Sequence, residues 1–149
     1  MQDVVNQDFK EYIENQKKAL KEQHKTPRKI IRDFINSCNK SEIDGVLKNI
    51  DSEIVFERRI DYQTKQKLEG IEEFIEYLKS DFQELIAFNF IVRSPWDIKL
   101  PMINISVKFY KTIINKDNET INRKLYRQFI FELNNDKICH IIMENLFGT

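Results

Sequence analysis

Three charged residues on predicted strands could carry chemistry together. Glu57 and Arg59 share one face of the first predicted strand, because alternate residues of a strand point the same way. Arg127 shares a face with Phe129 and Phe131, whose apolar side chains indicate the buried side. If both rows line the inside of a curled sheet, the three charges meet near its open end. The planar guanidinium of an arginine suits binding of a carboxylate.

Two arrangements of these charges are open, together with one possible error. Glu57 could pair with Arg127 in a purely structural contact. Alternatively, one arginine binds an anionic head group while apolar side chains hold the tail of the same molecule. The error would be a strand register shifted by one residue, which turns every side chain to the other face. The side chains expected to hold such a tail are Phe34, Val107, Phe109 and Ile141.

The cysteines and the histidine of the last strand do not suggest a nucleophile. Cys38 and Cys139 lie among apolar neighbours and match no metal or redox spacing, so we expect two small buried hydrophobes. His140 follows Cys139 directly, which places the two side chains on opposite faces of a strand. We expect Cys139, Ile141 and Met143 to point inward and His140 to point outward, toward a subunit interface.

Two aromatic residues lie in predicted loops near the expected pocket. Trp96 either borders the pocket or fills the core, and we favour the second interpretation. Tyr62 begins the loop over residues 61–69 and could line the pocket rim. The chain contains no zinc-type spacing, glycine-rich phosphate loop or serine elbow, so no cofactor or metal is predicted.

Composition favours a single globular domain. The chain has 149 residues, 24 basic and 24 acidic, so its formal net charge is zero and it offers no overall field for nucleic acid or an anionic membrane. Phenylalanine occurs 11 times, and glycine and proline three times each, which suits an aromatic-rich core. No secretory signal and no membrane-spanning stretch is recognised, so a soluble cytoplasmic protein is predicted.

The first third of the chain predicts three helices. Residues 3–24 form an amphipathic helix, which either packs on the outside of the domain or acts as a lid or an arm onto a partner subunit. Thr26 followed by Pro27 predicts a new helix start, so residues 1–25 are taken as an extension and residues 26–149 as the domain. A second start is predicted at Ser41, by a sequence that resembles a capping box.

The rest of the chain predicts one further helix and several strands. A strand over residues 53–60 and a loop over 61–69 precede a helix over 70–85. Alternating patterns follow over residues 88–93, 103–109, 125–133 and 138–146, with a loop at 94–101. This order predicts an α+β domain in which an antiparallel sheet curls into a cone, with three helices on its concave side and an extra N-terminal helix.

Three stretches resemble the nuclear-transport-factor-2-like superfamily, which includes ketosteroid isomerase and the polyketide-cyclase-like proteins. They are residues 30–47 as opening helices, 54–57 as first strand and 70–75 as the start of the third helix. The resemblance covers residues 26–147 and is more specific for fold than for function. It implies a cone-shaped, cystatin-like fold with a pocket at the open end and a homodimer formed through the outer face of the sheet.

The same resemblance implies roles for individual residues. Glu57 falls where ketosteroid-isomerase-like members carry their base, and an apolar cone would raise its pKa as proton abstraction requires. Phe34 stands where those members have a tyrosine donor, and Arg127 where they have an acid. Since phenylalanine donates no hydrogen bond and arginine stays charged, the isomerase mechanism is not expected, while another acid–base reaction remains open.

The expected function is therefore binding of a small, mainly apolar molecule, with an anionic head group as one option. Isomerase, cyclase or dehydratase-type chemistry would use Glu57 as base and Arg127 as anion anchor. The alternative is a non-catalytic dimerisation or protein-interaction module whose cone is filled by side chains. The residues expected to line the pocket are Phe34, Arg59, Tyr62, Trp96, Val107, Phe109, Phe129, Cys139, Ile141 and Met143.

Overall fold

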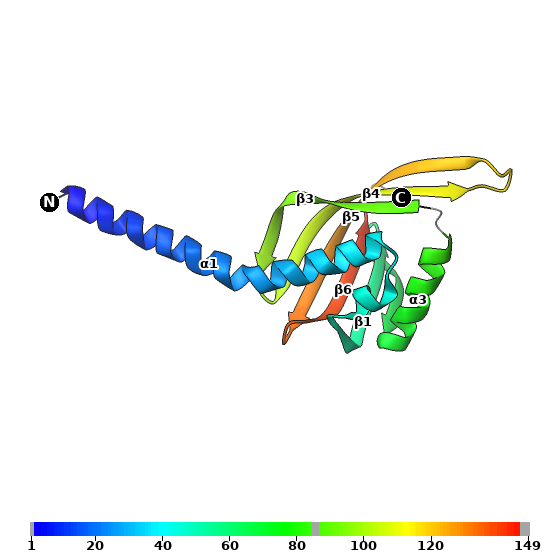
Figure 1. Ribbon diagram of the computed structural model, residues 1–149, viewed down its shortest axis with the longest axis horizontal. Helices are drawn as coiled ribbons and strands as arrows, with labels where there is room; N and C mark the ends of the chain where they lie inside the picture. The colour runs from blue at the N-terminus through cyan, green and yellow to red at the C-terminus, as the bar shows by residue number, and fades with distance from the viewer. Residues whose placement is uncertain (1, 85–86, 147–149) are drawn as a thin grey trace.

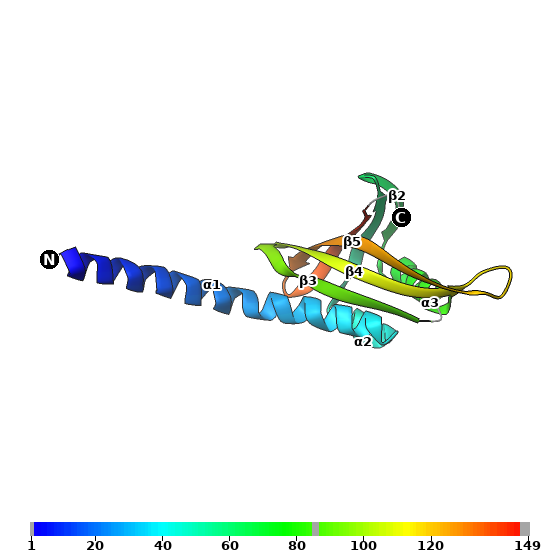
Figure 2. The same ribbon diagram turned by 90° about the horizontal axis from the view of Figure 1, so that it is seen from above.

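The computed structural model describes residues 2–84 and 87–146. A curled sheet of six strands carries helices on its concave side, and one helix extends far beyond it (Figures 1 and 2). The predicted α+β fold class is thereby confirmed. The elements in chain order are α1 Gln2–Asn39, α2 Ile43–Leu47, β1 Ile50–Ile60, β2 Gln63–Glu69, α3 Ile71–Glu84, β3 Ala87–Lys99, β4 Met102–Ile114, β5 Thr120–Asn134 and β6 Lys137–Asn145.

The sheet is mixed, which corrects the expectation of a purely antiparallel one. Its strand order is β2-β1-β6-β5-β4-β3, and β1 runs parallel to β6 while the other neighbours are antiparallel. The β1–β2 hairpin uses one edge of β1, so the chain reaches the other edge only after the long meander from β3 to β6. β6 then arrives in the same direction as β1.

Helix α1 is continuous through the predicted break. The expected helix start at Thr26 is wrong, because Pro27 lies inside α1. A proline inside a helix removes one backbone hydrogen bond, which normally disfavours it. Here the Pro27 ring is buried, while residues 6–26 are exposed apart from the half-buried His24. Pro27 therefore marks the point where α1 begins to pack on the domain, rather than the point where a helix begins.

The connection between α1 and α2 departs from the predicted cap. Ser41 has a positive φ of 55°, and Glu42 occupies the N-cap position without a side-chain cap bond. α2 is only five residues long. It packs so closely on α1 that a Cβ added at Gly45 would lie 2.5 Å from Oγ of Ser37. The small residue at position 45 thus permits the close approach of the two helices.

The polar segment predicted as a loop forms strand β2. Asp61 and Tyr62, at φ 52° and 63°, make a tight turn that returns the chain onto β1. β2 is an edge strand, mostly exposed, and only Leu68 packs against the core. Because burial produces the hydrophobic pattern of a strand, this exposed strand lacks one. The α3 start agrees with the prediction, with Gly70 at φ 89° donating its N–H to the Ile54 carbonyl at 2.8 Å.

Strand β3 also extends through a predicted loop. It continues to Lys99, and its pairing with β4 shifts register between Arg93 and Asp97.

The interior of the cone is filled largely by phenylalanine rings. Phe34 of α1 contacts Phe131 of β5 edge to face, with ring centroids 5.4 Å apart. Phe90 of β3 stacks on Phe109 of β4 at 4.6 Å.

Asn39, the last residue of α1, joins the helix to the edge strand β3. Its Nδ2 donates to the Phe90 carbonyl at 3.0 Å, and its Oδ1 accepts from the Phe90 N–H at 2.7 Å. The side chain therefore satisfies both backbone groups of Phe90 at an edge where no further strand pairs. This contact fixes the end of α1 against the rim of the cone.

We expect Asn39→Ala to lower the free energy of unfolding by about 1–3 kcal/mol, since it leaves two half-buried backbone groups without partners. Urea unfolding followed by circular dichroism measures this change. The matched control is Asn36→Ala, an exposed position on the same helix, where we expect a change within about 0.5 kcal/mol. Equal stability of the two variants would contradict the assigned role of Asn39.

Candidate functional site

The interior of the cone holds little free space. Its cavity has a volume of about 30 Å³, which is enough for roughly one water molecule. The cavity walls come from α1, α3 and four strands. They are Phe34, Cys38, Phe56, Phe74, Tyr77, Leu78, Asp81, Phe82, Phe90, Arg127, Phe129 and Met143. The described side chains thus fill the space in which a ligand was expected.

A polar group lies at the wall of this apolar cavity. The Arg127 guanidinium packs over the ring of Phe109 at 4.2 Å, and its Nη1 lies 3.5 Å from Sδ of Met143. Its Nε has no hydrogen-bond partner among the described residues. Burial lowers the pKa of Arg127, while the nearby Tyr77 and Asp81 act in the opposite direction. Arg127 is therefore a largely buried cation that contacts an aromatic ring and a sulfur atom, with Asp81 nearby.

Tyr77 of α3 belongs to the same group. Burial strongly raises the pKa of its hydroxyl, and the charge of Asp81 adds to that effect. Tyr77 is therefore neutral at ordinary pH and keeps its proton as a donor. Its ring lies 4.8 Å from that of Phe56. Arg127, Tyr77 and Asp81 together form a polar edge to an otherwise apolar wall.

Glu57 does not lie in the cone, which corrects the expected placement. Its Oε2 is 2.6 Å from Nε2 of His140, and its Oε1 is 3.6 Å from Nη2 of Arg59. These contacts are on the outer face of the sheet, because the preceding residue, Phe56, fills the inner face. The structure thus places Glu57 and Arg127 on opposite faces. The inward and outward faces of β1 are therefore exchanged relative to the expected ones, as a strand register shifted by one residue would produce.

The electrostatics of Glu57 fit a surface ion pair. Partial burial would raise the pKa of its carboxyl, but the hydrogen bond with His140 and the positive charge of Arg59 outweigh that effect and lower the pKa. A general base near neutral pH would need the opposite shift. His140 faces outward, as expected, and its partner there is Glu57.

Only some of the residues expected to line the pocket do so. Phe34, Phe129 and Met143 border the cavity. Val107 and Phe109 are buried on the same inner face, at 1% and 2% exposure, without bordering it. Ile141 is likewise fully buried within the core.

Cys139 turns away from the cone because of a bulge in β6. Leu133 and Glu132 of β5 pair with Ile138 and His140, which leaves Cys139 as the extra residue. Ile138 takes the buried position, and the Cys139 thiol lies 3.5 Å from the Glu132 carbonyl oxygen. The expectation that Cys139 points inward is therefore wrong, since a bulge interrupts strict alternation.

Trp96 and Tyr62 lie apart from the cone cavity. The guanidinium groups of Arg28 and Arg32 on α1 lie 5.3 and 5.5 Å from the Trp96 ring centroid, so Trp96 links β3 to α1. Tyr62 is 80% exposed in the β1–β2 turn. It borders a separate cleft of about 510 Å³ with Asp61, Gln128, Glu144, Asn145 and Leu146.

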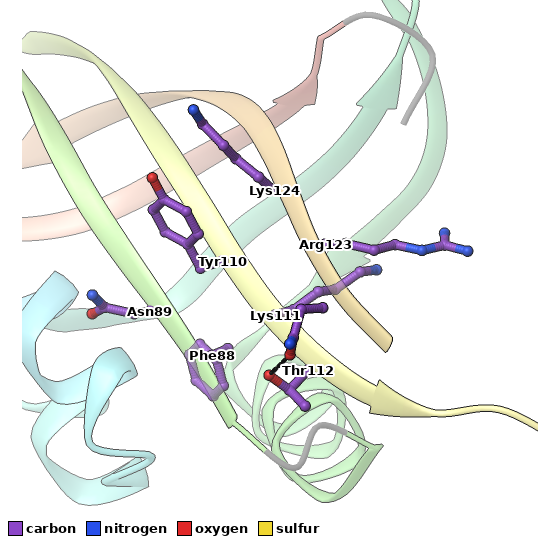
Figure 3. Close-up of a pocket in the computed structure, with 8 residues that line it drawn as sticks. Phe88, Asn89, Tyr110, Lys111, Thr112, Arg123 and Lys124 are labelled. Atoms are coloured by element: carbon purple, nitrogen blue, oxygen red, sulfur yellow. Dashed lines mark hydrogen bonds between the residues drawn. The ribbon is translucent and has the colours of Figure 1, made fainter. Parts of the chain in front are cut away.

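A further cleft lies on β3, β4 and β5, near the cone mouth (Figure 3). It has a volume of about 380 Å³. Lys111 and Arg123, paired across β4 and β5, extend in one direction, and Tyr110 and Lys124 extend in another. We call it the basic cleft, and it is lined by Phe88, Asn89, Tyr110, Lys111, Thr112, Asn122, Arg123 and Lys124. The cleft was not predicted from the sequence, because its three cations lie beyond the ends of the alternating patterns at residues 103–109 and 125–133.

The basic cleft adjoins the cone cavity through two stacked rings. Phe88 of the cleft stacks on Phe82 of the cavity wall at 5.6 Å. Burial lowers the pKa of Lys111, and the charges of Arg127 and Arg123 lower it further, while Asp81 opposes them. The lowered pKa of Lys111 thus reflects burial first and repulsion by the two neighbouring cations second. None of the eight lining residues is acidic, so the cleft suits an anion.

Neither a metal centre nor a membrane span is found in the described part of the chain. Residues 2–84 and 87–146 contain no group of three or more His, Cys, Asp or Glu side chains that could hold a metal ion. Within the same ranges, no helix is long and apolar enough to cross a membrane.

Comparison with known proteins identifies the fold and nothing finer. No family model matches the sequence, and no curated protein matches it. A protein assigned as a SnoaL-like polyketide cyclase from Shewanella denitrificans OS-217 superposes with a TM-score of 0.71 at 10% identity, covering 82% of this chain and 91% of its own. A cystatin-like fold protein of unknown function from Xanthomonas campestris gives 0.67 at 10% identity, covering 80% and 90%.

A third structure was solved with a small molecule. TerC, co-crystallised with polyporic acid, superposes with a TM-score of 0.65 at 14% identity, covering 82% of this chain and 91% of its own. At such identities the likeness shows the fold alone. The expected resemblance to the nuclear-transport-factor-2-like superfamily is confirmed at that level.

We expect Glu57→Gln to destabilise the protein at neutral pH and to have no effect in acid. Folding lowers the pKa of Glu57 below its ordinary value of 4.5, so its stabilising contribution is present above that value. The contribution is lost as pH falls through the folded-state pKa. Urea unfolding of the variant and the wild type from about pH 7 to about pH 3 measures the difference.

The matched control for this pH series is Glu53→Gln, an exposed glutamate on the same strand. We expect its stability to follow that of the wild type throughout the series. A difference between Glu57→Gln and the wild type that persists unchanged at about pH 3 would show that the Glu57 contact does not depend on charge.

Proposed function

We propose that this chain, which has the fold of the SnoaL-like polyketide cyclases, binds a small anionic molecule with an aromatic or apolar body. The proposed site is the basic cleft at the mouth of the cone, not the cone interior. The observation that carries the proposal is the composition of the cleft, where Phe88, Lys111 and Arg123 lie on the same side of the sheet and no carboxylate is among the eight lining residues.

The electrostatics of the cleft support an anionic ligand. Lys111 is partly buried, and the positive charges of Arg127 and Arg123 oppose its own and lower its pKa. A bound carboxylate, sulfonate or phosphate would offset this repulsion and form charge-assisted hydrogen bonds. Among the structural neighbours, TerC was crystallised with an acid, which agrees with this ligand class.

The dimensions of the cleft support a small ligand. A volume of about 380 Å³ falls within the range of small-molecule sites, which is roughly 300–1,000 Å³. Phe88 offers aromatic surface for the ligand body on the same side as Lys111 and Arg123. The cone cavity, with a volume of about 30 Å³, is too small to hold such a ligand. This favours a binding site outside the filled cone.

The alternative of a non-catalytic module is favoured by the same filled cone. Glu57 faces away from the cavity, so it offers no base to a ligand at the mouth. The carboxylate of Asp81, which borders the cavity beside Arg127, would be the acid–base group of any reaction there. Binding without turnover is the function that requires the fewest further groups.

We expect the double variant Lys111→Ser/Arg123→Ser to bind 8-anilinonaphthalene-1-sulfonate at least about tenfold more weakly than the wild type, because it loses two charge-assisted contacts. Fluorescence titration measures the affinity, and circular dichroism verifies the fold. The neutral probe N-phenyl-1-naphthylamine should bind both proteins equally.

The matched control removes two exposed lysines from β2, in Lys65→Ser/Lys67→Ser. We expect this variant to bind the sulfonate as the wild type does. Equal loss in both double variants would indicate a general charge effect and would overturn the cleft as the site. Unchanged binding in Lys111→Ser/Arg123→Ser would overturn it as well.

A further inference from the structure

We propose that residues 6–25 of α1 pair antiparallel with the same residues of a second copy of this chain. The helix leaves the domain at Pro27 and projects away from the sheet in both views (Figures 1 and 2). Four large apolar side chains on this projecting part are exposed to solvent. They are Phe9 at 64%, Tyr12 at 61%, Ile13 at 39% and Leu20 at 51%.

These side chains form one face of the helix. Spacings of four, three and four residues connect Phe9, Ile13, Gln16 and Leu20, which is the periodicity of a helix that packs lengthwise on another helix. Tyr12 borders the same face. We call these five residues the α1 stripe. The pattern continues through Gln23 into Pro27, Ile30 and Phe34, which are buried against the domain.

A helix with such a face is not expected to remain alone. The 20 residues from 6 to 25 are barely long enough for an isolated helix in water, whose stability in proteins comes mainly from packing an apolar face. In this segment no tertiary contact covers the α1 stripe, since its apolar members are exposed. A second α1 would cover about 30 Å of its length.

The position of the domain selects the antiparallel orientation. The α1 stripe lies on the same side of the helix as the residues that pack into the core. In a parallel pair, each partner helix would run directly into the domain of the other chain. In an antiparallel pair, the two domains lie at opposite ends, and Phe9 of one copy lies level with Leu20 of the other.

The charges along the segment match this orientation. The first half carries three carboxylates and one lysine, namely Asp8, Glu11, Glu14 and Lys10. The second half carries four lysines and one carboxylate, namely Lys17, Lys18, Lys21, Lys25 and Glu22. Antiparallel pairing places each acidic half beside a basic half, and it opposes the two helix dipoles favourably. The partner that complements this surface is therefore the chain itself.

The self-association test uses the full chain and two double variants. Ile13→Glu/Leu20→Glu places charges in the α1 stripe, and Gln7→Glu/Asn15→Glu places the same number of charges at exposed positions away from it. Analytical ultracentrifugation over a concentration series measures association. We expect the stripe variant to associate about 100-fold more weakly than the wild type, and the control variant to differ by less than about fivefold.

The result is interpretable even if the sheet also forms an interface, because the stripe variant should then retain only the smaller assembly. A wild type that stays monomeric, or a stripe variant with the wild-type association constant, would overturn the proposal. Since the substituted side chains are exposed, we expect circular dichroism to show no loss of fold. Binding of the projecting helix to anionic vesicles by a monomeric chain would also count against it.

Cysteine cross-linking tests the orientation. In a Cys139→Ser background, the single variants Phe9→Cys and Leu20→Cys are prepared separately and then mixed under mild oxidation. We expect disulfide-linked dimers mainly in the mixture, because positions 9 and 20 face each other only in the antiparallel pair. Efficient cross-linking of Leu20→Cys with itself would indicate parallel helices and would overturn the proposed arrangement. The buried Cys38 stays out of reach.

Discussion

Packing of phenylalanine rings inside the curled sheet is the interaction on which the rest of the structure depends. Phe34, Phe90, Phe129 and Phe131 touch one another or their neighbours across α1, β3 and β5 at centroid distances of 5.4–5.7 Å. These rings hold α1 against the sheet and occupy the volume that the same fold could use as a pocket. Replacing any of them by a small residue would leave a void that a packed interior cannot close cheaply.

Because apolar side chains fill the interior, the charged side chains lie at the cavity wall, at the cone mouth and on the outer face of the sheet. Arg127 stays at the cavity wall, with its guanidinium on Phe109, and the remaining cations collect on the neighbouring strands. Glu57 and His140 pair on the opposite face. The two groups are therefore separated by the sheet itself, and they act in different electrostatic surroundings.

The sequence predicted the architecture better than it predicted the site. The apolar rows of β4, β5 and β6 indicated their strands because each has one buried face. β2 was not predicted because an exposed edge strand buries few side chains. Pro27 wrongly predicted a helix start because the local preference of proline does not reveal that packing on the domain stabilises the helix around it. The parallel pairing of β1 with β6 depends on chain topology, which residue patterns do not encode.

The site errors have one physical origin. A strand has a period of two, so one residue of misregister exchanges its faces. Glu57 lies on the outer face, not the expected inner one, because Phe56 is the residue that fills the core. Cys139 points away from the cone, contrary to expectation, because a bulge adds one residue to β6. Aligning the chain by composition could not detect either shift. The basic cleft was not predicted because its cations lie beyond the ends of the two predicted strands and gather only when β4 and β5 pair along their full length.

The two edge strands of the sheet, β2 and β3, have a consequence for solubility. An unpaired strand offers backbone groups to strands of other molecules, which is a common route to aggregation. On β3, the Asn39 amide already occupies the backbone groups of Phe90, and Pro95 has no N–H to offer. On β2, Lys65 and Lys67 add exposed positive charge to a short strand. Both edge strands thus disfavour pairing with strands of other molecules and fibril-like stacking at high concentration.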